Sequence, residues 1–516
     1  QSLTTINFPN NLQHIGEYAF YNCRIDEVNI GPNVRTIGNY VFEQSTVSYF
    51  SVNTANSNYI SIDGVLCTRG GVLVKYPPNL SNQSYTVPSS INELLFNSFT
   101  YCKYLQNLTI NDNINNIGNY AFAFCDMLRY VEFNVSSTQV PDDSFYSCYK
   151  LVNITFSPTI TVIGERSFLN CSGLTTFSVP STISLISRRA FESCYNLEYV
   201  NLSEGIEWIG PSAFRYCRSL QEIAFPNSMN NISDYCFYEC RSIKTINFSS
   251  SIISIGSYSF SGCIGLTSYV FEPCIINIGP FSFSRCSNLE YVEFPSNVKF
   301  INESAFALCT KLETVNITAV KYIEFGAFYM CYSINELHIP STTSVIGYSA
   351  FQHCGMISEL TLEFGIYYID PYAFDNCSSI PYVDYPESIT YIDHHSFARC
   401  SSLEWINISK NIDVIYPYAF EYCSRLPELF IPHHINVICE GAFRHCTNLT
   451  NVTLSEGLTY IEGSVFYNCH SLPKITIPST VRLVGTYAFY NNTNLTRCIL
   501  TLGVTTIDDY AFGQCI

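Results

Sequence analysis

The chain has 516 residues, of which 47% are hydrophobic and only 13% charged, so it has enough apolar material to fold and is not intrinsically disordered. Its formal net charge is −17, and its 25 Lys and Arg residues are spread along the whole length. Nucleic acids and anionic lipids need clustered cations, so we expect no nucleic-acid partner and no direct membrane insertion of this segment. The length exceeds one ordinary core and favours several domains or an array of repeats.

A short repeat, marked by a phenylalanine that usually follows Ala or Ser, runs along nearly the whole chain. From Phe99 onwards the marker recurs every 23 residues, apart from one step of 22 before Phe328. Chance does not produce such a series. The marker phenylalanines are Phe20, Phe42, Phe99, Phe122, Phe145, Phe168, Phe191, Phe214, Phe237, Phe260, Phe283, Phe306, Phe328, Phe351, Phe374, Phe397, Phe420, Phe443, Phe466, Phe489 and Phe512.

Each repeat contains the same elements in the same order. Cys follows three residues after the marker, and a Leu-x-x-Ile-x-Ile pattern begins six residues after it, as at residues 403–408. This alternation predicts a short strand with its apolar side chains on one face. An apolar-x-x-Ile-Gly segment then leads to the next marker, as at residues 206–214. The Gly four residues before the marker favours a turn with positive φ, and Pro at the next position favours the start of a brief helical turn.

A unit of 23 residues cannot bury its apolar face alone, so neighbouring units must stack and share one core. The sequence therefore predicts an α/β repeat solenoid of about 21 repeats over residues 1–516, with one long parallel β-sheet and brief helical or 3-10 turns on the opposite side. The chain begins and ends inside a repeat, which we interpret as a sign of a fragment or a processed chain.

One region interrupts the period, because Phe42 and Phe99 lie 57 residues apart. That is two repeats and about 11 extra residues, and it places an insertion within residues 43–98. Two apolar runs flank Arg69-Gly70-Gly71, and this pattern predicts an inserted β-hairpin.

The repeat resembles the BspA-type (Treponema pallidum-type) leucine-rich repeat, most closely in residues 472–489, which read Leu-Pro-Lys-Ile-Thr-Ile-Pro-Ser-Thr-Val-Arg-Leu-Val-Gly-Thr-Tyr-Ala-Phe. The inserted hairpin, with its Asp-Gly-Val-Leu entry and Tyr-Pro-Pro exit, is also similar to hairpins of that family. The resemblance implies a leucine-rich-repeat horseshoe. It also implies a cell-surface or secreted protein of a mucosal protozoan parasite or a bacterium, used in adhesion to a host-cell, extracellular-matrix or microbial surface protein.

Two other classes compete with this interpretation. An intracellular, cytoplasmic leucine-rich-repeat scaffold has the same architecture, and free thiols would suit it. A polysaccharide-cleaving β-helix enzyme would need a cluster of carboxylates that breaks the repeat, and the only break offers Asp63 and Glu93. The sequence contains no nucleotide-binding or nucleophile motif, so we expect no enzyme activity, no catalytic residue and no cofactor.

The 24 cysteines allow disulfides, metal sites or buried thiols, and 19 of them occupy the same position of the repeat. Equivalent side chains in stacked repeats point the same way about 4.8 Å apart, whereas a disulfide needs facing Cβ atoms about 3.8 Å apart. No Cys-x-x-Cys pair suggests zinc. The pattern therefore favours buried free thiols, and Ser45 and Asn492 at the same position indicate a small polar group that bonds to turn backbone.

The remaining titratable pairs are interpreted as surface groups. His394-His395 and His433-His434 lack partners at metal-ligand spacing, so we expect exposed turn histidines and no metal site. Asp142-Asp143 is expected to be a solvated turn pair.

The outward positions of the predicted strands form an acidic stripe with aromatic side chains. Aromatic residues are favoured at interface hot spots, and a stripe of one charge steers an oppositely charged partner. The alternative is that an acidic protein has carboxylates everywhere and that Tyr is simply a good strand former. Some of the 17 Asn-x-Ser/Thr sequons, such as Asn201 and Asn407, fall on the same face, where a glycan would obstruct a partner. The candidate binding residues are Tyr199, Glu222, Tyr291, Glu293, Glu313, Glu336, Tyr382, Asp384, Glu404 and Trp405.

Overall fold

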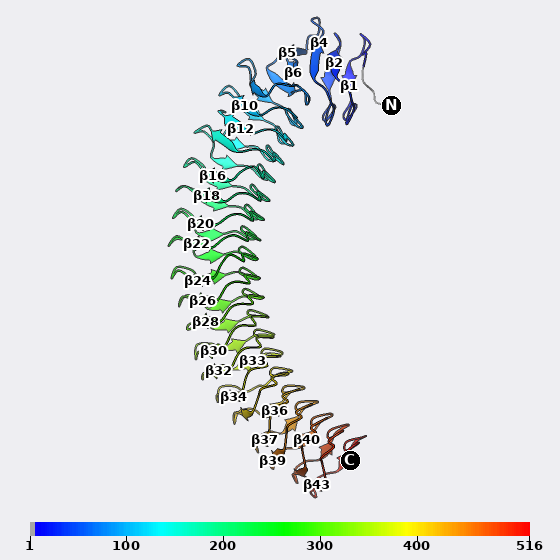
Figure 1. The fold of residues 1–516 in the computed structure, drawn as a ribbon, viewed down its shortest axis with the longest axis vertical. Coiled ribbons are helices and arrows are strands. Elements are labelled where there is room, and N and C mark those ends of the chain that lie inside the picture. Colours follow the sequence, from blue (N-terminus) through cyan, green and yellow to red (C-terminus); the bar gives the residue numbers. More distant parts are fainter. Residues whose placement is uncertain (1–5) are drawn as a thin grey trace. The chain divides into compact units, whose positions relative to one another are not determined.

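The computed structural model describes residues 6–516, so the partial repeat expected at residues 1–5 lies outside the described residues. The chain divides into two compact units, residues 1–252 and 253–516. Within each unit, successive repeats stack and their strands pair in parallel (Figure 1), which confirms the solenoid of parallel strands. That residues 1–516 form one continuous horseshoe stays a prediction.

Nearly every repeat contributes two strands, so each unit contains two ladders of parallel strands where one sheet was expected; in the repeat of Phe397 the second strand is reduced to a single bridge at Ile392, and the insertion interrupts both ladders of the first unit. The Leu-x-x-Ile-x-Ile pattern forms the first ladder, in which Val131 of one repeat pairs with Ile154 of the next. The Ile-Gly segment forms the second ladder, in which Ile163 pairs with Ile186. Its two-residue strands are too short to show an alternating sequence pattern, and this is why the second ladder was missed.

The strands of the first unit are short throughout. Its first ladder consists of β2 (Glu27–Ile30), β4 (Tyr49–Val52), β8 (Ser84–Thr86), β10 (Asn107–Ile110), β12 (Tyr130–Phe133), β14 (Asn153–Phe156), β16 (Thr176–Ser178), β18 (Tyr199–Asn201), β20 (Glu222–Ala224) and β22 (Thr245–Asn247). Its second ladder consists of β1 (His14–Ile15), β3 (Thr36–Ile37), β9 (Glu93–Leu94), β11 (Asn116–Ile117), β13 (Gln139–Val140), β15 (Val162–Ile163), β17 (Leu185–Ile186), β19 (Trp208–Ile209) and β21 (Asn231–Ile232).

The second unit repeats the same two ladders. Its first ladder consists of β24 (Ser268–Val270), β26 (Tyr291–Glu293), β28 (Thr314–Asn316), β30 (Glu336–Ile339), β32 (Glu359–Leu362), β34 (Tyr382–Asp384), β35 (Trp405–Asn407), β37 (Glu428–Ile431), β39 (Asn451–Leu454), β41 (Lys474–Ile477) and β43 (Arg497–Leu500). Its second ladder consists of β23 (Ser254–Ile255), β25 (Asn277–Ile278), β27 (Phe300–Ile301), β29 (Tyr322–Ile323), β31 (Val345–Ile346), β33 (Tyr368–Ile369), β36 (Val414–Ile415), β38 (Val437–Ile438), β40 (Tyr460–Ile461), β42 (Leu483–Val484) and β44 (Thr506–Ile507).

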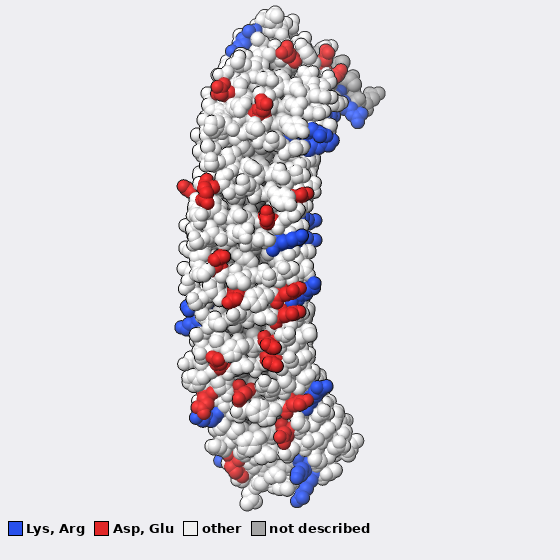
Figure 2. All heavy atoms as spheres, turned by 60° about the vertical axis from the view of Figure 1, so that its left-hand side comes forward, with Lys and Arg blue, Asp and Glu red and all other residues white. Residues whose placement is uncertain are grey.

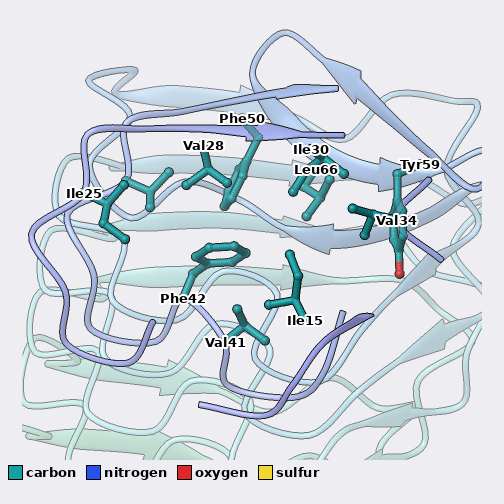
Figure 3. Packing of buried hydrophobic residues seen from close by; sticks show 11 residues of the cluster. Ile15, Ile25, Val28, Ile30, Val34, Val41, Phe42, Phe50, Tyr59 and Leu66 are labelled. Atoms are coloured by element: carbon teal, nitrogen blue, oxygen red, sulfur yellow. The ribbon is translucent and has the colours of Figure 1, made fainter. Parts of the chain in front are cut away.

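The marker phenylalanines form the centre of the core. Phe168 is fully buried, and its ring stacks on Phe145 at 5.3 Å and on Phe191 at 5.1 Å between ring centroids. At the start of the first unit, Phe42 lies in the middle of a cluster that includes Ile15, Val28 and Phe50 (Figure 3). Each ring therefore packs against the rings of both neighbouring repeats, and no repeat has a core of its own.

The turn around each marker is not helical, and this corrects the expected helical or 3-10 turns: residues 6–516 contain no helix. The N–H groups of Asp143, Phe145 and Ser147 each donate to a carbonyl of the next repeat at 2.8 Å. The N–H groups between them close turns within their own repeat. Asp143 and Ser147 both have a φ of 57°, which breaks a right-handed helix. Every second N–H is thereby directed to the neighbouring repeat, whereas in a helix the N–H groups would bond to carbonyls of the same segment.

The Gly that recurs in several repeats also has a different cause from the one expected. The Gly four residues before the marker does not have positive φ; positive φ falls two residues before and two residues after the marker. A Cβ atom on Gly118 would lie 2.3 Å from the backbone nitrogen of Phe96, and one on Gly210 would lie 2.7 Å from that of Arg188. At these two repeats the backbones of neighbours approach too closely for a Cβ atom, whereas other repeats accommodate a side chain such as that of Leu95 or Ser187 at the same position.

The insertion contains the expected hairpin and a second one before it. Strands β6 (Val65–Thr68) and β7 (Val72–Lys75) pair antiparallel across the Arg69-Gly70-Gly71 turn, which confirms the prediction. Strand β5 (Tyr59–Ile62) also pairs antiparallel with β6, and β7 then joins the second ladder through β9. Lys75 is buried and donates to Glu43 Oε2 at 3.2 Å and to Thr100 Oγ1 at 2.6 Å, so a buried polar network fastens the insertion to the repeats on either side.

Replacing Phe168 with Ala should destabilise the first unit by about 3–5 kcal/mol, because it leaves a cavity between two stacked rings. Urea unfolding followed by circular dichroism would measure the change. Tyr130→Ala is the matched control, since that ring is 50% exposed and its loss should cost about 0.5 kcal/mol or less. Equal effects of the two substitutions would show that the phenylalanine stack does not hold the repeats together.

Candidate functional site

The candidate binding residues of the first unit lie side by side on the outward face of the first ladder. Tyr199 opens β18, Glu222 opens β20, and the two residues are partners in register. Both are exposed because side chains alternate along each strand, and the residues that follow them, Val200 and Ile223, point into the core. The outward orientation of these two residues is as predicted, while Tyr291 and Glu293 are only half-exposed; that any of the candidate residues contacts a partner stays a prediction.

The second unit places two groups of the candidate residues on the same face of its first ladder. Tyr382 of β34 is the register partner of Trp405 of β35, and these side chains are 42% and 48% exposed. Asp384 and Glu404 flank this aromatic pair, and both carboxylates are exposed. The result is an exposed pair of aromatic residues, of the types that interface hot spots favour, bordered by two carboxylates.

The other group lies on strands β26 and β28. The Tyr291 hydroxyl donates to Glu293 Oε2 at 2.6 Å, and this bond to a carboxylate raises the pKa of the tyrosine. Glu313 is exposed directly before β28. Glu336 opens β30 apart from both groups, and its register partner is Glu359.

The acidic residues do not continue along the whole of the first ladder, although an extended acidic stripe was predicted. The first outward position of the ladder carries Glu336, Glu359 and Glu428, but the later strands β41 and β43 carry Lys474 and Arg497 there. Carboxylates recur over the face turned forward in Figure 2, while Lys and Arg gather mostly near its right-hand edge. The acidic part of the face in the second unit therefore ends at about β37.

Several sequons share this face, as expected, among them Asn201, Asn247, Asn316 and Asn407 at the same strand position. Asn201 ends β18, and Asn407 ends β35 beside the aromatic pair, where its side-chain amide donates to Asp384 Oδ1 at 2.8 Å. Both asparagines are exposed, so a glycan on Asn407 would cover Tyr382 and Trp405.

The repeated cysteines lie in the core, as predicted. The Cys171 thiol donates to the carbonyl of Phe145 in the preceding repeat at 3.0 Å, and Cys194 does the same to Phe168 at 3.2 Å. Burial raises the pKa of Cys194 to about 12, so the group is neutral at physiological pH. Asn492 occupies the same position and donates to the same kind of carbonyl at 3.0 Å, which confirms that the position needs a small hydrogen-bond donor.

Two of the expected surface groups are in fact packed. Asp143 is buried and forms a bidentate ion pair with Arg166 at 2.8 and 2.9 Å, so the expectation of a solvated acid pair was wrong for this residue. His395 is partly buried between the rings of Tyr372 and Tyr418, and burial lowers its pKa. Sequence offsets did not reveal these partners because they belong to neighbouring repeats.

The described residues contain no cluster of three or more His, Cys, Asp or Glu side chains placed to hold a metal ion. Within residues 6–516, no helix has the length and apolar character that crossing a membrane requires.

Sequence reasoning missed an open trough in the second unit. It has a volume of about 430 Å³ and is lined by aromatic side chains, among them Phe325 and Tyr348. Its only signal in the sequence is a run of three small residues, Ser304, Gly326 and Ser349, at a repeat position that elsewhere often holds an aromatic residue.

Comparison with known families identifies the class of this protein. The model of the BspA type leucine rich repeat region matches residues 1–63, 78–198, 184–313, 308–427 and 413–516. The chain therefore belongs to the BspA-type leucine-rich-repeat family, as its sequence predicted. The residues between 63 and 78 that the family model leaves unmatched contain β6 and β7 of the insertion.

Several solved structures are similar to the chain. A leucine-rich repeat protein from Bacteroides ovatus is 20% identical, with 85% of this chain and 97% of that chain covered and a TM-score of 0.45. A leucine rich cell surface protein from Faecalibacterium prausnitzii is 20% identical over 87% and 94% of the two chains, with a TM-score of 0.30. The leucine-rich repeat protein of T. pallidum is 21% identical over 42% and 90%, with a TM-score of 0.29. No curated protein matches the chain.

Thiol titration should separate the buried cysteines from the exposed ones. In the native protein, an aromatic disulfide reagent should react with the exposed Cys498 and leave Cys171, Cys194 and Cys217 untouched, because their burial suppresses the reactive thiolate. After denaturation without reductant, nearly all of the 24 cysteines should react. A count that stays low after denaturation would show that the cysteines are oxidised and would refute the assignment of buried thiols.

Proposed function

We propose that this chain is a non-enzymatic protein-binding ectodomain, exposed at the cell surface or secreted, that adheres to a host-cell, extracellular-matrix or microbial surface protein. The observation that carries the proposal is the outward face of the first ladder in the second unit. There, Tyr382 and Trp405 form an exposed aromatic pair between the carboxylates of Asp384 and Glu404. A surface of this kind favours a partner with basic side chains around an apolar centre.

The geometry of a repeat array is better suited to binding a partner than to catalysing a reaction. Neighbouring repeats hold equivalent side chains about 4.8 Å apart, so each outward column is a long strip of regularly spaced groups. A partner that spans several strands makes many contacts, each of which adds to its affinity. The candidate residues are accordingly assigned as contact residues, with no catalytic role.

Replacing Tyr291, Tyr382 and Trp405 together with Ala should weaken binding to cultured epithelial cells and to wells coated with extracellular matrix by about ten-fold or more, since large aromatic side chains dominate such interfaces. Surface plasmon resonance and cell-binding assays with the purified chain would measure the loss. The matched control is Tyr367→Ala, Tyr368→Ala and Tyr460→Ala, which removes three exposed aromatic rings from the second ladder of the same unit. Similar losses in both variants, or none in either, would place the contact surface elsewhere.

An intracellular leucine-rich-repeat scaffold is the second candidate, and the buried thiols favour it because they need no oxidising compartment. Cellular location separates the two. On intact source cells, the ectodomain should be labelled by a membrane-impermeant biotin reagent, and glycosidase treatment should shift its mass if sequons such as Asn201 are modified. Labelling only after the cells are permeabilised would favour the scaffold.

A further inference from the structure

Many repeats of the second unit carry an aromatic ring at the position two residues before the marker, and there the rings of adjacent repeats stack. Tyr258 and Phe281 stack there at 4.5 Å between ring centroids with nearly parallel planes. Further along, His395 stacks on Tyr372 at 4.6 Å and on Tyr418 at 4.9 Å. We call this line of rings the turn ladder. In the second unit this position carries an aromatic ring in seven repeats and a small residue in five, namely Ser304, Gly326, Ser349, Gly441 and Ser464.

Three consecutive repeats lack a ring in the turn ladder. Ser304, Gly326 and Ser349 occupy the position between Phe281 and Tyr372, and all three are buried at the bottom of the resulting trough. The trough has a volume of about 430 Å³ and is lined by Phe281, Ser304, Phe325, Gly326, Tyr329, Tyr348, Ser349, Gln352 and Tyr372. Phe325 and Tyr348, one position earlier in their repeats, fill part of this gap: Tyr348 packs on Phe325 at 5.3 Å and on Tyr372 at 5.4 Å between ring centroids.

The walls of the trough are aromatic and remain open. Phe325 and Tyr348 stack on each other at 5.3 Å and are 48% and 42% exposed, so their rings are not covered by the rest of the chain. Phe281, the ring that stacks on Tyr258, forms one end of the trough, and Tyr372 forms the other end. Gln352 is held in place on the floor side by its hydrogen bond to Asp375 at 2.9 Å. Such a site is preformed, because each wall is fixed by the neighbouring repeats.

The charge around the trough is negative. No lining residue carries a formal charge, but Glu303 adjoins Ser304 and Glu324 adjoins Phe325 in the chain. Burial, Asp393 and Glu324 together raise the pKa of Asp370, so Asp393 and Glu324 both lie close enough to Asp370 to act on it. A cationic group next to an apolar ligand would therefore be attracted to the rim.

We propose that the trough binds an aromatic side chain of a protein partner, a tryptophan or tyrosine with a basic residue beside it. An inserted ring would take the place of a missing ring of the turn ladder, with stacking faces available at the distances of about 4.5–7 Å that aromatic pairs prefer. An aromatic anchor in a preformed pocket is also the typical centre of a protein interface. This inference adds a second contact surface to the proposed protein-binding function, at a site that does not include the candidate residues of the first ladder.

The chain itself supplies a substitution that fills the trough. Tyr372 and Tyr418 occupy the same repeat position as Ser304 and Ser349 with similar φ, 60° and 57° against 49° and 54°. The double variant Ser304→Tyr and Ser349→Tyr should therefore fold while it rebuilds the missing part of the turn ladder. Ser464→Tyr makes the same change at the same position outside the trough and is the matched control.

Saturation-transfer NMR with the capped peptide Gly-Lys-Trp-Lys-Gly would test the proposal, with Gly-Lys-Leu-Lys-Gly as the control peptide. The chain would be expressed in bacteria, so that the Asn302 sequon stays unmodified in every variant. We expect saturation of the indole protons in the native chain and in Ser464→Tyr, and at least about a ten-fold weaker Kd in the filled variant. Phe325→Ala with Tyr348→Ala, which removes two exposed walls, should weaken binding equally and provides the test if the filled variant does not fold.

The proposal would be overturned if the leucine peptide bound as well as the tryptophan peptide, or if binding were unchanged in both the Ser304→Tyr/Ser349→Tyr and the Phe325→Ala/Tyr348→Ala variants. It would also be overturned if chitotriose showed saturation that is lost in those variants, because the trough would then be a saccharide site. The variant that lacks Tyr291, Tyr382 and Trp405 should keep the peptide signal. Loss of cell binding in that variant and loss of peptide binding in the filled variant are thus separate outcomes, so either proposal can fail without the other.

Discussion

The whole structure depends on how the backbone at the marker turn divides its hydrogen bonds. Residues with positive φ two positions before and after each marker turn every second N–H toward the next repeat, as at Asp143 and Ser147. Each turn is thereby bonded to its neighbours as firmly as a strand in a sheet, and the buried thiol of Cys171 adds a further bond to the Phe145 carbonyl. With two strand ladders and this bonded turn, a repeat of 23 residues is connected to its neighbours on all sides.

This bonding explains why the surface carries the function. A repeat fastened to its neighbours in this way leaves little freedom to its inward side chains, which must be apolar or form hydrogen bonds within the stack. The outward positions are free to vary, and each variation lies next to the equivalent residues of adjacent repeats. Aromatic pairs such as Tyr382 with Trp405, and gaps such as the one at Gly326, are local changes within a regular array.

The buried polar groups follow the same rule of pairing between repeats. Asp143 has its cation Arg166 one repeat away, and Lys75 joins Glu43 and Thr100 across the insertion. Such pairs leave no uncompensated charge in the core. Substituting one partner would leave the charge of the other buried and unpaired. The insertion is therefore part of the packed structure of the first unit and not a loose excursion from it.

The sequence by itself determined the repeat, the first strand ladder, the hairpin at Arg69-Gly70-Gly71, the buried cysteines and the outward position of residues such as Trp405, because periodicity fixes which side chains must be buried together. It did not determine the non-helical turn, the second ladder, the cause of the glycine at Gly118 or the partner of Asp143. Those features depend on contacts between residues 22–26 positions apart, which exist only once repeats are stacked. The trough has the same origin, since small residues such as Ser304 and Ser349 form an opening only when three repeats lie next to each other.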